Sequence, residues 1–322
     1  MSDRIHHHLA RVRATAVSVS ARVFNPAVDA VEIARAIRTR AEITAFKRRV
    51  VVSQRFPEPV RMRRQTTALA VVTHVAAASR AEEETVERLA KTLDSLLESL
   101  GHTRLEIVLN TIPGLHSASR LPQYIRRRIV VRERELSEPL MLGFEAQEEF
   151  VRRAHTADWF LYLEDDILLE DALVLEKLEY FNSRVPPSAL LLPHRFEYWQ
   201  GERTYIDLVS KKSADICSWN RLTMLEVGGW RFAEFENPHS GFYALSQAQL
   251  GRWLKSGRRW RGEISFVAAR ESAATGCLAE AFRLYKPHPD NMTFFEVRHL
   301  DTKYSEEHHR RHVAAAAARE AT

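Results

Sequence analysis

The chain of 322 residues is poor in cysteine, with only Cys217 and Cys277, and neither lies in a Cys-x-x-Cys pair. This excludes a disulfide framework and a zinc site built from thiolates, so we expect two buried free thiols. No stretch approaches the roughly 20 consecutive apolar residues that cross a bilayer. The first 25 residues also hold no compact apolar run followed by a cleavage site. These absences predict a cytoplasmic protein.

Glycine-rich phosphate loops are also missing. The sequence holds only 11 glycines, and neither GxxxxGK[ST] nor GxGxxG occurs anywhere in it. Those loops let backbone amides approach a phosphate closely, and their absence argues against P-loop and dinucleotide enzymes. No internal repeat is present either.

What the chain does have is enough apolar material for one large core or two smaller ones, at 45% hydrophobic residues. Its net charge of +5 is unevenly spread, because residues 1–65 hold 14 Lys and Arg against five Asp and Glu. Asn25-Pro26 is a suitable helix start, and a helix over about 27–49 is expected to follow. Such a basic arm fits anionic lipid, nucleic acid or a phosphorylated substrate, and equally a solvated helical face.

From residue 68 onward, apolar runs of strand length alternate with helical patterns, which predicts an α/β fold. We expect a basic helical N-terminal arm over 1–65, a domain over 66–300 and a C-terminal tail over 301–322. The expected strands cover 68–75, 105–111, 129–135, 159–163 and 189–196, and the expected helices cover 82–100, 139–155 and a stretch beginning near Glu170-Asp171.

Three consecutive acids, Glu164-Asp165-Asp166, follow the almost wholly apolar run 159–163. A run of that length and composition is typical of a strand buried on both faces, and ligands of open α/β sheets gather beyond the carboxyl ends of such strands. Adjacent carboxylates repel one another, and Mg²⁺ or Mn²⁺ relieves that repulsion. The alternative is that the acids merely end a strand and solvate a turn.

The segment FLYLEDDILL resembles the acidic DxD-like motif of GT-A-fold glycosyltransferases, in the EDD form of some family-2-like members. Farther along, RLTMLEVGGWRFAEFEN is similar to the family's Gly-Gly-aromatic segment followed by an acidic stretch. The sequence departs from the family at Asn237, where Asp is frequent. The resemblance spans about 67–299 and implies a Rossmann-like mixed sheet flanked by helices.

The resemblance also implies roles for particular residues. It implies a metal-dependent transfer of a sugar from a nucleoside-diphosphate donor to a hydroxyl, with Mn²⁺ or Mg²⁺ as the cation. Asp166 is the expected metal ligand, and His299 is a second candidate, as late histidines serve in some members. Donor contacts are expected from Thr73, Asn110, Glu164, Asp165, Gly229 and Trp230, and Glu236 is the candidate catalytic base that deprotonates the acceptor.

Each of these roles has a plainer alternative, such as a loop-stabilising acid for Glu236 or a core tryptophan for Trp230. The acceptor is expected to be a glycan, a lipid-linked group or another hydroxyl compound, with peripheral contact at the inner face of an anionic membrane left open. Nucleic acid is disfavoured, because aromatic residues hardly interleave the basic stretch. Two further functions stay open, a nucleotidyltransferase and an inactive glycosyltransferase-like scaffold. The glycine-free loop THVAAASRAEEE argues against the nucleotidyltransferase.

Overall fold

The computed structural model describes residues 66–76, 80–208, 224–235, 237–256, 264, 268–279, 281–307 and 309–310. The expected arm with its helix over 27–49, Cys217, Glu236 and the end of the tail lie outside these residues. Cys277 is free and fully buried, as predicted. Across the described ranges, no helix is long and apolar enough to span a bilayer.

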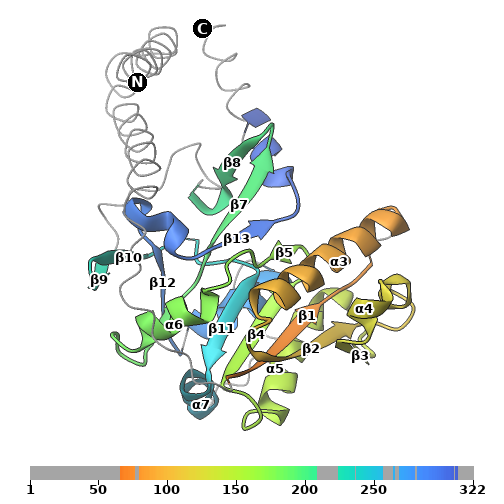
Figure 1. Ribbon diagram of the computed structural model, residues 1–322, viewed down its shortest axis with the longest axis horizontal. Coiled ribbons are helices and arrows are strands. Elements are labelled where there is room, and N and C mark those ends of the chain that lie inside the picture. The colour runs from red at the N-terminus through yellow and green to blue at the C-terminus, as the bar shows by residue number, and fades with distance from the viewer. Residues whose placement is uncertain are drawn as a thin grey trace, which may run out of the picture.

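A five-stranded sheet forms the centre of the molecule (Figure 1). Its order is β11-β4-β1-β2-β3, in which only β11 is antiparallel to its neighbour. The sequence builds it from short apolar runs, which suit strands covered on both faces. The bounds are Thr67–Thr73 for β1, Arg104–Thr111 for β2, Ile129–Glu133 for β3, Trp159–Glu164 for β4 and Phe242–Ser246 for β11.

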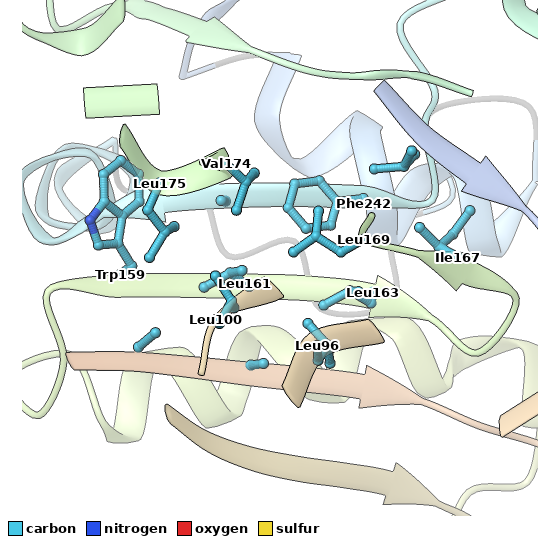
Figure 2. Close-up of a cluster of buried hydrophobic side chains, with 14 of the residues drawn as sticks. Leu96, Leu100, Trp159, Leu161, Leu163, Ile167, Leu169, Val174, Leu175 and Phe242 are labelled. Atoms are coloured by element: carbon cyan, nitrogen blue, oxygen red, sulfur yellow. The ribbon is translucent and has the colours of Figure 1, made fainter. Parts of the chain in front are cut away.

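Two hydrophobic cores cover the two faces of this sheet, because successive side chains of a strand point to opposite faces. Figure 2 shows Leu161 and Leu163 of β4 near Leu96 and Leu100, which lie in and directly after α3 (Glu82–Ser99). The intervening Tyr162 belongs to the other core. The remaining α-helices are α4 (Gln123–Arg126), α5 (Leu142–Arg152), α6 (Val174–Asn182), α7 (Gln247–Lys255), α8 (Ala269–Glu271) and α9 (Cys277–Ala279).

The predicted fold class, an α/β Rossmann-like mixed sheet flanked by helices, is confirmed for the described part of the chain. The expected helix over 82–100 is also confirmed. The expected helix over 139–155 divides into a 3-10 turn (η2, Pro139–Met141) and α5. The helix expected from Glu170-Asp171 begins later, at Val174, because the Asp171 carboxylate accepts the Leu173 amide and forms a turn before the helix.

The single strand predicted over 189–196 is wrong. Pro193 interrupts it, since proline has no amide hydrogen to donate to a neighbouring strand. On one side of Pro193, the Leu192 amide donates to Tyr285, and on the other side the His194 amide donates to Phe295. The two halves, β6 (Ala189–Leu191) and β7 (His194–Trp199), therefore belong to different sheets.

Those two sheets have four strands each. One has the order β6-β12-β10-β9, and the other has the order β5-β13-β7-β8. Their remaining strands are β5 (Ile167–Leu168), β8 (Glu202–Tyr205), β9 (Met224–Val227), β10 (Trp230–Glu234), β12 (Arg283–Pro287) and β13 (Glu296–His299), and the remaining turns of helix are η1 (Ala118–Arg120), η3 (Ile206–Leu208), a π-helix η5 (Ser272–Gly276) and η6 (Pro289–Phe294).

The turn between β9 and β10 makes a stability prediction. Gly228 has φ +56°, and a Cβ built on it would lie 1.9 Å from the hydroxyl of the buried Tyr180. Gly228→Ala is therefore expected to lower the free energy of unfolding by about 3 kcal/mol, from left-handed backbone strain plus displacement of Tyr180. Gly229→Ala is the matched control, because Gly229 has φ +83° and a Cβ built on it would meet nothing within 4 Å. Equal losses for both variants in urea titrations would contradict the role of Tyr180.

Candidate functional site

Three of the predicted residues meet in one row across the central sheet. Thr73, the last residue of β1, is in register with Asn110 of β2 on one side and Glu164 of β4 on the other. All three lie at the carboxyl ends of parallel strands, where ligands of α/β sheets bind. The structure therefore brings together Thr73, Asn110 and Glu164, which are far apart in the sequence.

The acidic run turns away from the sheet directly after this row. The Glu164 amide donates to the carbonyl of Gly241 at 2.9 Å, which anchors the end of β4 beside β11. Asp165 is held twice, since its carboxylate lies 2.5 Å from Nδ1 of the buried His74 and its carbonyl accepts the Thr92 hydroxyl at 2.9 Å. Asp165 thus faces the end of β1.

Asp166 faces the other predicted metal ligand. Strand β5 pairs with β13, and this pairing places His299 opposite Ile167, the residue after Asp166. The His299 Nε2 atom lies 3.5 Å from Asp166 Oδ2, and the Arg88 guanidinium approaches the same oxygen at 3.6 Å. The Leu300 amide also donates to the Asp166 carbonyl at 2.8 Å. The structure therefore brings Asp166 and His299 together, although 132 intervening residues separate them in the sequence.

Sequence reasoning missed Glu197 and Arg88. Glu197 is fully buried on β7, and its Oε1 lies 2.8 Å from Nδ1 of His299. The available signal was the strand HRFEYW, in which a carboxylate lies among aromatic residues where a partner must neutralise it. Arg88 had no signal beyond its place on the helix facing the end of β4.

The pKa values of the two partly buried acids of the site, Glu164 and Asp166, differ sharply. Burial and the neighbouring Asp166 raise the pKa of Glu164 to about 7. Burial would also raise the pKa of Asp166, but the hydrogen bond and charge of His299 outweigh it, together with Arg88, and lower this pKa to about 2. The same pairing raises the pKa of His299 to about 9 against the effect of burial. At neutral pH the site therefore holds the ionised carboxylate of Asp166 beside the protonated imidazolium of His299.

The residues present fit a divalent cation. Asp166 Oδ1 and Glu164 Oε1 are buried and have no hydrogen-bond partner. Buried carboxylate oxygens of this kind are costly unless a ligand meets them, and hard oxygens suit Mg²⁺ and Mn²⁺. Over the described residues, no group of three or more His, Cys, Asp and Glu side chains is placed so that it could hold a metal ion. Such a cation would take Asp166 and His299 and complete its shell with phosphate oxygens and water.

The other donor-contact predictions are not joined to this cluster. Gly228 and Gly229 form the tight turn between β9 and β10, and the ring of Trp230 packs on Phe294 at 4.9 Å between centroids. Trp230 is partly buried against the larger core. The roles of Gly229 and Trp230 stay predictions without a contact in the site. Glu236, the candidate base, lies between described neighbours but is itself outside the described residues.

Fold and site together define an α/β protein in which the carboxylate of Asp166 and the imidazole of His299 lie beside the carboxyl edge of the central sheet. No protein-family model matches the chain, and no curated protein matches it either. Among solved structures, a mycobacterial protein is similar at 12% identity and a TM-score of 0.39, over 79% of this chain and 74% of that one. A 4-diphosphocytidyl-2C-methyl-D-erythritol synthase is similar at 11% identity and a TM-score of 0.35, over 70% and 92%. Likenesses this low carry no weight for function, which rests on the site alone.

Proposed function

We propose that this protein is a divalent-metal-dependent glycosyltransferase that moves a sugar from a nucleoside-diphosphate donor to an acceptor hydroxyl. One observation carries the proposal. Asp166 and His299 face each other at 3.5 Å, beside the row of Thr73, Asn110 and Glu164 at the carboxyl edge of the sheet. A cation site and a polar nucleotide edge next to each other are what a diphosphate-linked donor requires.

The charge of the leaving group sets the chemical requirement. When the bond between sugar and diphosphate breaks, negative charge grows on the diphosphate, and the enzyme must stabilise it. A bound Mn²⁺ or Mg²⁺ would supply that stabilisation as a Lewis acid. Asp166 and His299 would hold the cation, and Arg88 lies 3.6 Å from Asp166 as a neighbouring positive charge.

The remaining residues of the site would bind and orient the donor. Thr73 and Asn110 lie where the base and ribose meet this sheet edge, and the amide nitrogen of Asn110 is buried without a hydrogen-bond partner. Glu164 keeps a buried oxygen available for a sugar or ribose hydroxyl. Asp165, whose carboxylate contacts His74, lies in the sequence between Glu164 of the donor-binding row and the metal ligand Asp166. Deprotonation of the acceptor by Glu236 stays part of the proposal.

A thermal-shift panel tests the proposal. We expect one of UDP, GDP, CDP and dTDP to raise the melting temperature with Mn²⁺ but not without it, since a ligand that binds only the folded state stabilises it by mass action. The shift is expected to vanish in Asp166→Ala. Asp158→Asn is the control. Asp158 directly precedes β4, at the end of the strand opposite to Asp166, and its carboxylate accepts the amide and hydroxyl of Thr67.

The panel separates the competing functions. A shift that survives in Asp166→Ala, or that needs no metal, would contradict the proposed cation site. No shift with any nucleotide would favour the inactive scaffold. A separate turnover assay distinguishes the nucleotidyltransferase, which would release pyrophosphate from a nucleoside triphosphate and not a nucleoside diphosphate from a sugar donor.

A further inference from the structure

The buried carboxylate of Glu197 has no place in the mechanism above, although it contacts the candidate metal ligand. Its side chain is fully buried on β7. One oxygen lies 2.8 Å from His299 Nδ1, and the other accepts the backbone amide of Ser305 at 2.9 Å. Both oxygens are therefore used as acceptors, by two partners from the C-terminal part of the chain.

This arrangement fixes the orientation of the imidazole. Both oxygens of Glu197 are placed as acceptors, so the proton on Nδ1 of His299 is donated to Glu197, and a cation would take the place of the proton on Nε2. The opposite ring nitrogen, Nε2, is then directed at Asp166, 3.5 Å away. Metal-binding histidines commonly use a carboxylate in this way to fix their tautomer and increase the basicity of the free nitrogen.

The strand pairing makes the contact specific. β13 lies between β5 and β7, as Figure 1 shows, so that His299 at its end contacts Asp166 next to β5 on one side and Glu197 of β7 on the other. The ring of Tyr304 covers His299 with centroids 5.6 Å apart. Residues beyond 300, where the sequence predicts a C-terminal tail, thus contribute to the surroundings of His299.

We propose that Glu197 is the positioning residue of the cation site, holding His299 so that Nε2 is available as a ligand, with the Ser305 amide holding Glu197 in turn. This inference rests on the proposed metal-dependent function. It assigns Glu197 no contact with donor or acceptor. Its effect is transmitted through His299 alone.

The test is the affinity of the full chain for Mn²⁺, measured from the electron paramagnetic resonance signal of the free ion. The titration is done with Mn²⁺ alone and with each of UDP, GDP, CDP and dTDP. Glu197→Ala is expected to weaken Mn²⁺ binding by about 10- to 100-fold, the usual cost of losing such a partner. Glu197→Gln is expected to lose less, because its amide oxygen still accepts from His299 while its NH₂ group faces the Ser305 amide.

Glu296→Gln is the matched control. Glu296 lies on the same strand as His299, but its carboxylate binds Arg203 and Tyr205 and not the imidazole. Its loss should leave the Mn²⁺ affinity unchanged. A second readout is the ¹⁵N spectrum of the His299 ring, in which the wild type should show a proton on Nδ1 when Mg²⁺ is bound, and Glu197→Ala should show a mixture of tautomers.

The outcomes are distinguishable. If Glu197→Ala binds Mn²⁺ as tightly as the wild type while Asp166→Ala does not, the positioning role is wrong and the proposed function stands. If the wild type binds no Mn²⁺ under any condition, the proposed function fails and this inference fails with it. If Glu197→Ala does not fold, Glu197→Gln and Ser305→Pro decide. Ser305→Pro removes the amide hydrogen that Glu197 accepts, and wild-type affinity in both variants would overturn the inference.

Discussion

Replacing Asp207 by alanine is expected to lower the free energy of unfolding by about 4 kcal/mol, measured by urea denaturation at pH 7. The Asp207 carboxylate is buried in η3 and accepts hydrogen bonds from Arg195 at 2.8 and 3.0 Å and from Lys286 Nζ at 2.7 Å. Removing it leaves two buried cations without their counter-charge. Breaking a buried ion pair from one side typically costs about 3–5 kcal/mol.

An exposed ion pair provides the control for Asp207. Asp290 pairs with Arg231, and both side chains are nearly half exposed, so water screens their interaction. Asp290→Ala is expected to cost less than about 1 kcal/mol. If both variants lost the same small amount, Arg195 and Lys286 would have to be solvated in the variant, which contradicts their burial.

The same cluster predicts a sensitivity to acid. Burial alone would raise the pKa of Asp207, but Arg195 and Lys286 outweigh it and hold this pKa well below its ordinary range. A depressed carboxyl pKa contributes stability above the unfolded-state pKa of about 4, and that contribution is lost as the pH falls further. The wild type should therefore lose stability below about pH 4, and this component should be missing in Asp207→Ala.

Replacing Asp166 by asparagine is expected to lower donor turnover at least about 100-fold, measured as release of nucleoside diphosphate from the sugar donor that the nucleotide panel identifies. Asparagine has nearly the same shape but carries no charge to hold a cation or to pair with His299. Chelation of metal by EDTA should reduce the wild type to a similar level, and added Mn²⁺ should restore only the wild type.

Asp158→Asn serves as the control for turnover. It makes the same chemical change at the other end of β4, where the Asp158 carboxylate accepts hydrogen bonds from the amide and hydroxyl of Thr67. We expect wild-type turnover from it. Turnover in Asp166→Asn that still responds to Mn²⁺ as the wild type does would show that the cation binds elsewhere.

Much of the central sheet could be predicted because its signals are local. The apolar runs that became β1, β2 and β4 are short, uninterrupted and of strand length, and the acidic head of α3 suits a helix start. The two wrong element boundaries also have local causes. Pro193 divided one predicted strand between two sheets, and the Asp171 side chain held a turn that delayed α6.

The candidate site also has residues that the sequence predicted and residues that it did not. The sequence placed Thr73, Asn110 and the run from Glu164 at the ends of strands, and parallel pairing then puts such ends at one edge. It left Glu197 and Arg88 unnoticed, because their significance depends on contacts with His299 and Asp166 across β7, β13 and α3. A buried charge in a strand indicates that a partner exists but does not identify it.

The sequence by itself therefore determined the α/β class, the positions of the central strands and the acidic run at the end of β4, since each depends on neighbouring residues. Only the tertiary structure decided that His299, one of several late histidines, meets Asp166 at 3.5 Å, and that Glu197 and Ser305 surround it. The physical reason is that a strand's period fixes which side chains share a face, whereas the pairing of β13 between β5 and β7 results from long-range hydrogen bonding and burial.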